Sequence, residues 1–161
     1  GAITHQDGLG NQGRTLAGDV QVMSAGSGIT HSEFNHEPQA CLLFQIWIHT
    51  ARKSAEPRWE NEQFPGLDRA GRWVALASGR DSDVDALRIN QDAVVLGAHL
   101  EVGQCLDYGF KDRFGYMVPA TGRLLVNGVE VGARDGLAMA GEEHVTFKAL
   151  EPSELVLVET V

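Results

Sequence analysis

The chain has 161 residues, of which 43% are hydrophobic, and this length and composition are typical of one or two compact globular domains. Its formal charge is −9, from 22 acidic against 13 basic side chains. That balance argues against binding to nucleic acid or to an anionic membrane surface, because there is no basic surplus to displace counterions. The longest apolar run, residues 42–48, is much shorter than a membrane helix. We therefore expect a cytoplasmic protein.

The first half of the chain contains one strong strand pattern. Residues 40–50 (ACLLFQIWIHT) are rich in Leu, Ile, Phe and Trp on both alternating faces, which predicts a strand buried in a sandwich or barrel. Residues 51–72 are polar and contain two prolines, which predicts a long surface crossover that is either a plain connector or a structured lid. Residues 79–85 (GRDSDVD) read as an acidic loop.

The second half shows the same short-strand rhythm. Residues 122–131 (GRLLVNGVEV) place two apolar runs around Asn127-Gly128, which favours a hairpin with a type I′ turn. Residues 154–160 (ELVLVET) predict another buried strand. No segment has helical periodicity over three turns, so the sequence predicts an all-β fold.

Two cysteines, Cys41 and Cys105, are too few and too far apart for a disulfide framework or a Cys-x-x-Cys metal site. We interpret them as buried free thiols in a reducing compartment. The chain begins with Gly1 rather than Met, and we expect that its original start was cut, processed or lost.

An internal repeat relates the two halves. Residues 19–26 (DVQVMSAG) match residues 135–141 (DGLAMAG) with one deletion, and Gly1 and Gly122 open equivalent apolar runs. This ordered succession indicates an ancestral duplication. The second copy carries residues 93–121 before Gly122, whereas nothing precedes Gly1, so the first β-unit is expected to lack its opening strands.

One short motif has the residue types of a metal site. In GSGITHSE, His31 and Glu33 are two positions apart, so on a strand their side chains point to the same side. An imidazole and a carboxylate suit first-row divalent metals, including non-haem iron. Taken alone, the pair is a weak signal, and an ordinary surface contact between His and Glu is the favoured interpretation.

Longer stretches resemble a known family. GDVQVMSAGSGITHSEFN, LLFQIWI and PRWENEQF resemble the first domain of the pirin family of two-domain cupins, and VNGVEVGARDGLAM resembles its degenerate second domain. The resemblance implies a tandem cupin, in which each domain is a double-stranded β-helix or jelly-roll barrel. It places an incomplete N-terminal cupin domain at residues 1–88 and the degenerate domain at residues 89–161.

The resemblance also implies a metal centre. Pirins bind one metal, most commonly iron, through three His and one Glu, and Mn, Ni, Cu, Co or Zn would suit the same ligands. The HSE motif supplies His31 and Glu33 as metal ligands. The other two family ligands come from an HPxH-type segment that would precede Gly1. His5 matches a different family position and is not among the ligands carried over, so half a metal site is expected.

Two functions follow from the resemblance. The first is a metal-dependent dioxygenase acting on flavonols such as quercetin, with Glu33 as the catalytic base that takes the substrate's hydroxyl proton. The alternative is a non-enzymatic, redox-sensing protein of the transcription-coregulator type. The chain alone is expected to be metal-poor and inactive, or to associate with itself or with a complementary N-terminal segment.

Overall fold

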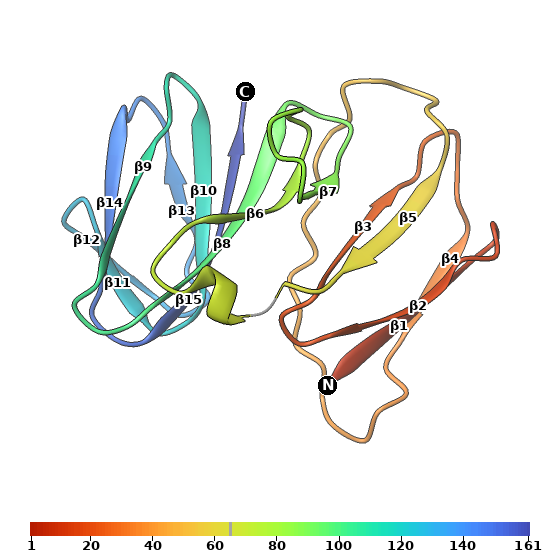
Figure 1. The fold of residues 1–161 in the computed structure, drawn as a ribbon, viewed down its shortest axis with the longest axis horizontal. Coiled ribbons are helices and arrows are strands. Elements are labelled where there is room, and N and C mark those ends of the chain that lie inside the picture. The colour runs from red at the N-terminus through yellow and green to blue at the C-terminus, as the bar shows by residue number, and fades with distance from the viewer. Residues whose placement is uncertain (65) are drawn as a thin grey trace. The chain divides into compact units, whose positions relative to one another are not determined.

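The computed structural model describes residues 1–64 and 66–161, and strands account for nearly all of the regular structure there. The chain divides into two compact units, which are described separately: unit 1 consists of Gly1–Pro65 and Leu87–Gln91, and unit 2 of Gly66–Ala86 and Asp92–Val161 (Figure 1). The prediction of an all-β fold is confirmed. In the described residues the one helix is the 3-10 turn η1 (Gly66–Arg69), and no helix is long and apolar enough to span a membrane. The predicted cupin boundary between residues 88 and 89 stays a prediction.

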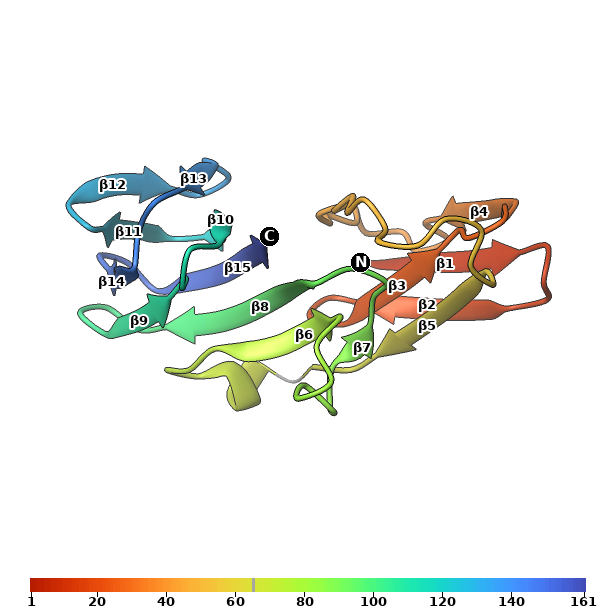
Figure 2. The same ribbon diagram turned by 90° about the horizontal axis from the view of Figure 1, so that it is seen from above.

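Unit 1 contains two small antiparallel sheets, which Figures 1 and 2 show from two sides. One has the strand order β2-β1-β4, and the other pairs β3 with β5. The short strand β7 contacts β3 and β5. The bounds are β1 (Ala2–Asp7), β2 (Gln12–Leu16), β3 (Val20–Ser24), β4 (His31–Phe34), β5 (Arg58–Glu62) and β7 (Leu87–Arg88).

The centre of unit 1 is unusually polar. His5 is fully buried and Thr15 is nearly so, whereas the buried apolar side chains of this unit are Ala2, Phe64 and Leu87. Buried polar groups are stable only when they are hydrogen-bonded. The interior of unit 1 must therefore be held by a network of polar contacts.

Unit 2 has an apolar interior between two antiparallel sheets. One has the order β13-β10-β15-β8-β6 and the other β12-β11-β14-β9. Side chains alternate between buried and more exposed along β14 and β15, as expected for strands with one face on a core. The bounds are β6 (Val74–Ser78), β8 (Ala93–Leu100), β9 (Cys105–Gly109), β10 (Phe114–Thr121), β11 (Arg123–Val126), β12 (Val129–Gly132), β13 (Leu137–Met139), β14 (His144–Ala149) and β15 (Ser153–Thr160).

Two predicted elements of unit 2 are confirmed. The hairpin forms from β11 and β12, and its turn residues Asn127 and Gly128 both have positive φ angles, 44° and 87°, as a type I′ turn requires. Strand β15 covers the predicted segment 154–160. At these two places the turn residues and the apolar alternation specify the structure locally, so the sequence alone predicts the hairpin and the strand.

The predicted buried strand at residues 40–50 is wrong. The segment is drawn as coil between β4 and β5 in Figures 1 and 2, with Leu42 81% and Trp47 86% exposed. A strand forms only by pairing with a neighbour. Within the described residues, no backbone hydrogen bond joins residues 41–48 to another segment. The pattern indicates strand propensity, but no strand among the described residues pairs with this segment.

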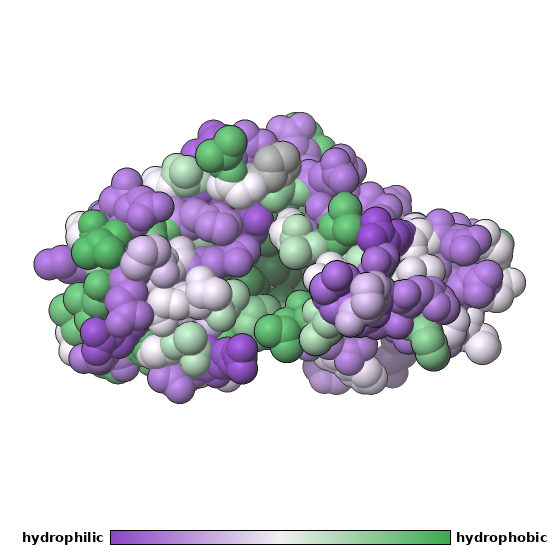
Figure 3. Space-filling model, turned by 90° about the horizontal axis from the view of Figure 1, so that it is seen from below, coloured by the Kyte–Doolittle hydropathy of each residue, from purple (hydrophilic) through white to green (hydrophobic). Residues whose placement is uncertain are grey.

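Two smaller predictions also need correction. The polar segment 51–72 is more than a crossover, because it contains β5 and η1. The cysteines are free as predicted but not buried, since Cys41 is half-buried and Cys105 is exposed. Other exposed apolar side chains are distributed over the surface, and the face in Figure 3 shows apolar patches interspersed among polar residues.

Candidate metal centre

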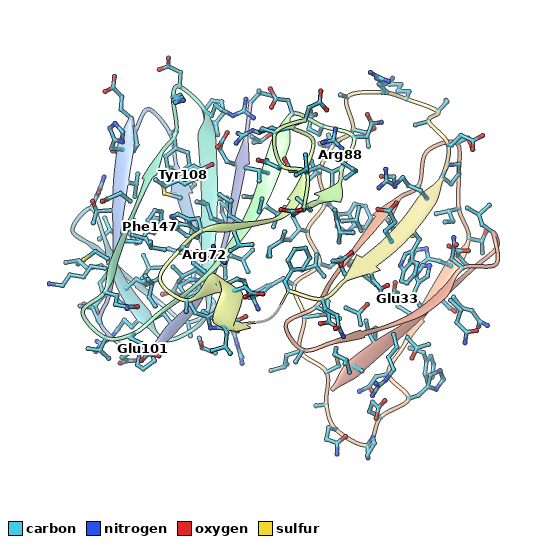
Figure 4. The ribbon with its side chains drawn as sticks, viewed as in Figure 1. Glu33, Arg72, Arg88, Glu101, Tyr108 and Phe147 are labelled. Atoms are coloured by element: carbon cyan, nitrogen blue, oxygen red, sulfur yellow. The ribbon has the colours of Figure 1, made fainter. Side chains whose placement is uncertain are left out.

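The HSE motif forms the start of β4, in unit 1. His31 and Glu33 project to the same side of this strand, as their spacing predicts, and in the register of β4 with β1 they lie opposite Asp7 and His5. His31 is exposed, and the Glu33 side chain is 26% exposed. Figure 4 labels Glu33 among the side chains of unit 1. The two sequence-predicted residues thus share one face with two further ionisable side chains.

The two carboxylate oxygens of Glu33 have different surroundings. Oε1 accepts a hydrogen bond from Gln21 Nε2 at 2.8 Å and shares another with His5 Nδ1, also at 2.8 Å. The amide of Gln21 is held in turn by Thr15, whose Oγ1 donates to Gln21 Oε1 at 3.0 Å. Oε2 is buried and has no hydrogen-bond partner in the described residues. One oxygen is therefore fixed by the protein and the other is left available.

His5 is the centre of this network. Its Nε2 is 3.1 Å from Asp7 Oδ2, and its ring stacks on Trp59 with the centroids 4.7 Å apart and the planes 5° from parallel. The ring of His31 lies 5.6 Å away at 22°. Space for the indole exists because the residue opposite His5 on β2 is Gly13, where a Cβ would lie 2.0 Å from Trp59 Cη2.

Asp7 is held by the turn that joins β1 to β2. Burial of Asp7 raises its pKa, but hydrogen bonds from Asn11, from His5 and from the backbone N–H groups of Asn11 and Leu9 outweigh this and lower the pKa to about 2. Asp7 is therefore a carboxylate at neutral pH and accepts the Nε2–H of His5.

The residues present fit a divalent metal in the type of their donors. Imidazole and carboxylate are borderline and hard donors that first-row metals accept. A buried carboxylate oxygen without a partner is unfavourable, and a cation would satisfy it. Among residues 1–64 and 66–161, no group of three or more His, Cys, Asp or Glu side chains is arranged to hold a metal. As ligands, His31 and Glu33 would supply two donors, and a closed site needs more.

The assignment of His31 and Glu33 as metal ligands stays a prediction, and the sequence does not identify the residues that hold them. His5 matches no ligand position of the resembled family, and Gln21 and Trp59 lie outside the HSE motif. Their roles depend on strand register and on the approach of β3 and β5, which local patterns do not specify. The only local signal was the turn sequence DGLGN after His5, which is typical of a hairpin that brings Asn11 back to Asp7.

Unit 2 contains a second buried polar cluster. Glu159 is 2% exposed and accepts hydrogen bonds from Arg80, Arg113 and Tyr108, and Arg113 also pairs with Asp92 at 3.0 Å. Burial of Tyr108, together with the hydrogen bond and charge of Glu159, raises its pKa to about 12. Each partner donates a hydrogen bond that Glu159 accepts. We therefore interpret this cluster as a buried structural ion network and not as a ligand site.

Two family models match the chain. Residues 1–48 match the model described as Pirin, and residues 75–160 match the model described as Quercetinase C-terminal cupin domain. A pirin-like protein from Caulobacter vibrioides is 56% identical over 160 residues, which cover 99% of this chain and 69% of that protein. A quercetin 2,3-dioxygenase from Escherichia coli strain K12 is 32% identical over 161 residues, covering 99% of this chain and 68% of the enzyme.

Solved structures agree with these relatives. The crystal structure of YhhW from Escherichia coli superimposes with a TM-score of 0.92 at 30% identity, covering 100% of this chain and 68% of that chain. A second structure, of the bacterial pirin YhhW in complex with nickel(II), superimposes with a TM-score of 0.89 at 30% identity over 99% of this chain and 68% of that one.

Proposed function

Because the chain belongs to the pirin family of cupin proteins, we propose that it serves as a metal-dependent dioxygenase acting on flavonols such as quercetin. The observation that carries this proposal is the buried, unpartnered Oε2 of Glu33 on the same strand face as His31. The similarity to an Escherichia coli quercetin 2,3-dioxygenase supports the reaction class.

In this proposal His31 and Glu33 are two of the ligands of one divalent metal, with iron as the native ion. The nickel(II) complex of a related pirin supports a divalent metal without fixing its identity. When bound, the metal supplies Lewis acidity toward the 3-hydroxyl and the adjacent carbonyl of the flavonol. Glu33 and His31 orient the substrate's chelating edge toward β4.

Glu33 also acts on the substrate's proton. Its Oε1 already takes part in two hydrogen bonds, so the proton of the 3-hydroxyl would pass to Oε2. An ionised carboxylate oxygen has two lone pairs, so Oε2 can serve as a ligand and as the proton acceptor. The product of this step is the flavonol enolate, the form of the substrate that reacts with oxygen.

The test of this role is aerobic turnover of quercetin by the iron-loaded protein, extended to the full length of its relatives. Glu33→Ala should lower kcat by about 100-fold or more, the usual contribution of a general base. Glu37→Ala is the matched control, because Glu37 is a carboxylate four residues along the chain whose side chain, in the described residues, pairs only with the exposed Arg14. Equal rates for the wild type and Glu33→Ala would exclude this role for Glu33.

We propose further that the 161-residue chain by itself holds metal weakly. Two protein donors give a much lower affinity than the four of a closed site, and an HPxH-type segment would supply the others. Residues 41–48, of which 42–47 are exposed, offer unpaired backbone to such a segment or to a second copy of the chain. Metal analysis combined with sizing chromatography tests this, and a monomer holding one equivalent of tightly bound iron would refute it.

A further inference from the structure

We infer that His5 is a positioning residue for Glu33: it fixes the carboxylate from behind so that Oε2, and not Oε1, is presented to the metal. The inference rests on the proposed metal site and assigns a role to a residue that does not itself bind the metal. Its basis is the unequal environment of the two oxygens on one carboxylate.

His5 cannot be a ligand in the arrangement observed. Its Nδ1 is hydrogen-bonded to Glu33 and its Nε2 to Asp7, so neither nitrogen has a lone pair free for a metal. The side chain is also fully buried. Any effect of His5 on a bound metal must therefore pass through Glu33.

The ring of His5 is fixed more firmly than a single hydrogen bond requires. Asp7 binds the Nε2 side of the ring and so keeps Nδ1 directed toward Glu33. Asp7 is itself held by the side chain and backbone N–H of Asn11. The indole of Trp59 lies nearly parallel to the ring and limits its rotation. A support of this kind is what orients a metal ligand and determines its affinity.

Gln21 provides the second bond to Oε1 from the other sheet. With both donors in place, rotation of the Glu33 carboxylate would break two hydrogen bonds at once and leave a buried oxygen unpaired. With His5 removed, one bond remains and the carboxylate can turn. We expect metal affinity to fall by about 10- to 100-fold, the usual effect of losing such an outer partner.

Three variants separate this role from a purely structural one. His5→Leu removes both hydrogen bonds, whereas His5→Asn keeps a polar atom near the position of Nδ1 and should restore part of the support. Gln21→Leu removes the other bond to Oε1. The matched control is His36→Leu, because His36 is exposed and its one described ring contact is with Phe34.

The experiment titrates the protein, extended to the full length of its relatives as in the turnover assay, with Mn²⁺ and measures the free ion by electron paramagnetic resonance, alongside a thermal melt. His5→Leu should raise the dissociation constant by tenfold or more, His5→Asn and Gln21→Leu by less, and His36→Leu not at all. If His5→Leu does not fold, the same comparison is made with His5→Asn and Gln21→Leu.

The variant Glu33→Ala distinguishes a failure of the positioning role of His5 from a failure of the proposed metal site. If Glu33→Ala weakens binding while the folded His5 and Gln21 variants bind Mn²⁺ as the wild type does, the positioning role is overturned and the metal site stands. If Glu33→Ala binds as the wild type does, the proposed site and the inference both fall. A lowered melting temperature with an unchanged dissociation constant would mark His5 as structural and overturn the inference.

Discussion

Replacing Gly13 with alanine would place a methyl group inside the indole of Trp59. The Cβ would lie 2.0 Å from Cη2, and Gly13 has an ordinary backbone conformation, so the conflict is one of space. Ordinary contact begins near 3.4 Å, so the ring must retreat by about 1.4 Å or β2 must move. Either shift disrupts the stack on His5.

The size of the effect follows from two opposing terms. Overpacking of a well-packed site lowers the free energy of unfolding by about 1–3 kcal/mol. Replacing glycine by alanine recovers about 0.4–1 kcal/mol by restricting the unfolded chain. We expect Gly13→Ala to destabilise unit 1 by about 1–2 kcal/mol.

Urea denaturation measures this loss, and the ring-current shift of the His5 imidazole protons reports the stack. Gly8→Ala is the matched control, because its Cβ would meet only Thr30 O at 3.6 Å. In a Trp59→Leu background the cost of Gly13→Ala should largely disappear, which a double-mutant cycle detects. If Gly13→Ala matches Gly8→Ala within about 0.5 kcal/mol and leaves the His5 signals unshifted, the packing argument is wrong.

Three other results should follow from the structure. Glu159→Leu leaves two guanidinium groups without their shared carboxylate and should lower the free energy of unfolding by about 3 kcal/mol, measured by urea titration. Glu130 forms an exposed ion pair with Arg123, so Glu130→Ala should lower it by less than about 1 kcal/mol in the same titration. The pKa of Tyr108 is raised to about 12, so the protonated phenol stabilises the fold fully below pH 10 and this stabilisation is lost between pH 10 and 12. The difference in free energy of unfolding between the wild type and Tyr108→Phe should therefore shrink in that pH range. Trp47 is exposed, so Trp47→Ser should change the free energy of unfolding by less than about 0.5 kcal/mol while reducing light scattering at high concentration. The ring of Phe147, labelled in Figure 4, is fully buried, so Phe147→Ala should lower the free energy of unfolding by about 3–5 kcal/mol. Equal melting temperatures for Trp47→Ser and Phe147→Ala variants would contradict the burial pattern.

The sequence was sufficient where structure is determined locally. The turn at Asn127-Gly128 and the alternation of residues 154–160 each specify a strand or a turn without reference to distant residues, and the structure contains both. The spacing of His31 and Glu33 likewise determines that they share a face once the strand exists.

The sequence was insufficient where a residue depends on what lies across from it. Residues 40–50 have the composition of a buried strand, but pairing and cover come from other segments, and Trp47 is exposed. The same limit applies to His5, whose meaning comes from the register that places it opposite Glu33 and from the indole that β5 brings against it. Neither fact is encoded in the residues next to His5.

The polar interior of unit 1 has a thermodynamic consequence. The heat capacity increase on unfolding comes mainly from exposing apolar surface, and exposing polar surface reduces it. Unit 2 contains a cluster of fully buried aliphatic and aromatic side chains, whereas unit 1 buries a histidine and a hydroxyl group at its centre. Unit 1 should therefore have the flatter dependence of stability on temperature, and calorimetry should assign most of the heat capacity change to unit 2. The stability of unit 1, which carries the candidate metal ligands, would then depend mainly on hydrogen bonds between polar side chains, and a bound ion could add to these contacts at any temperature.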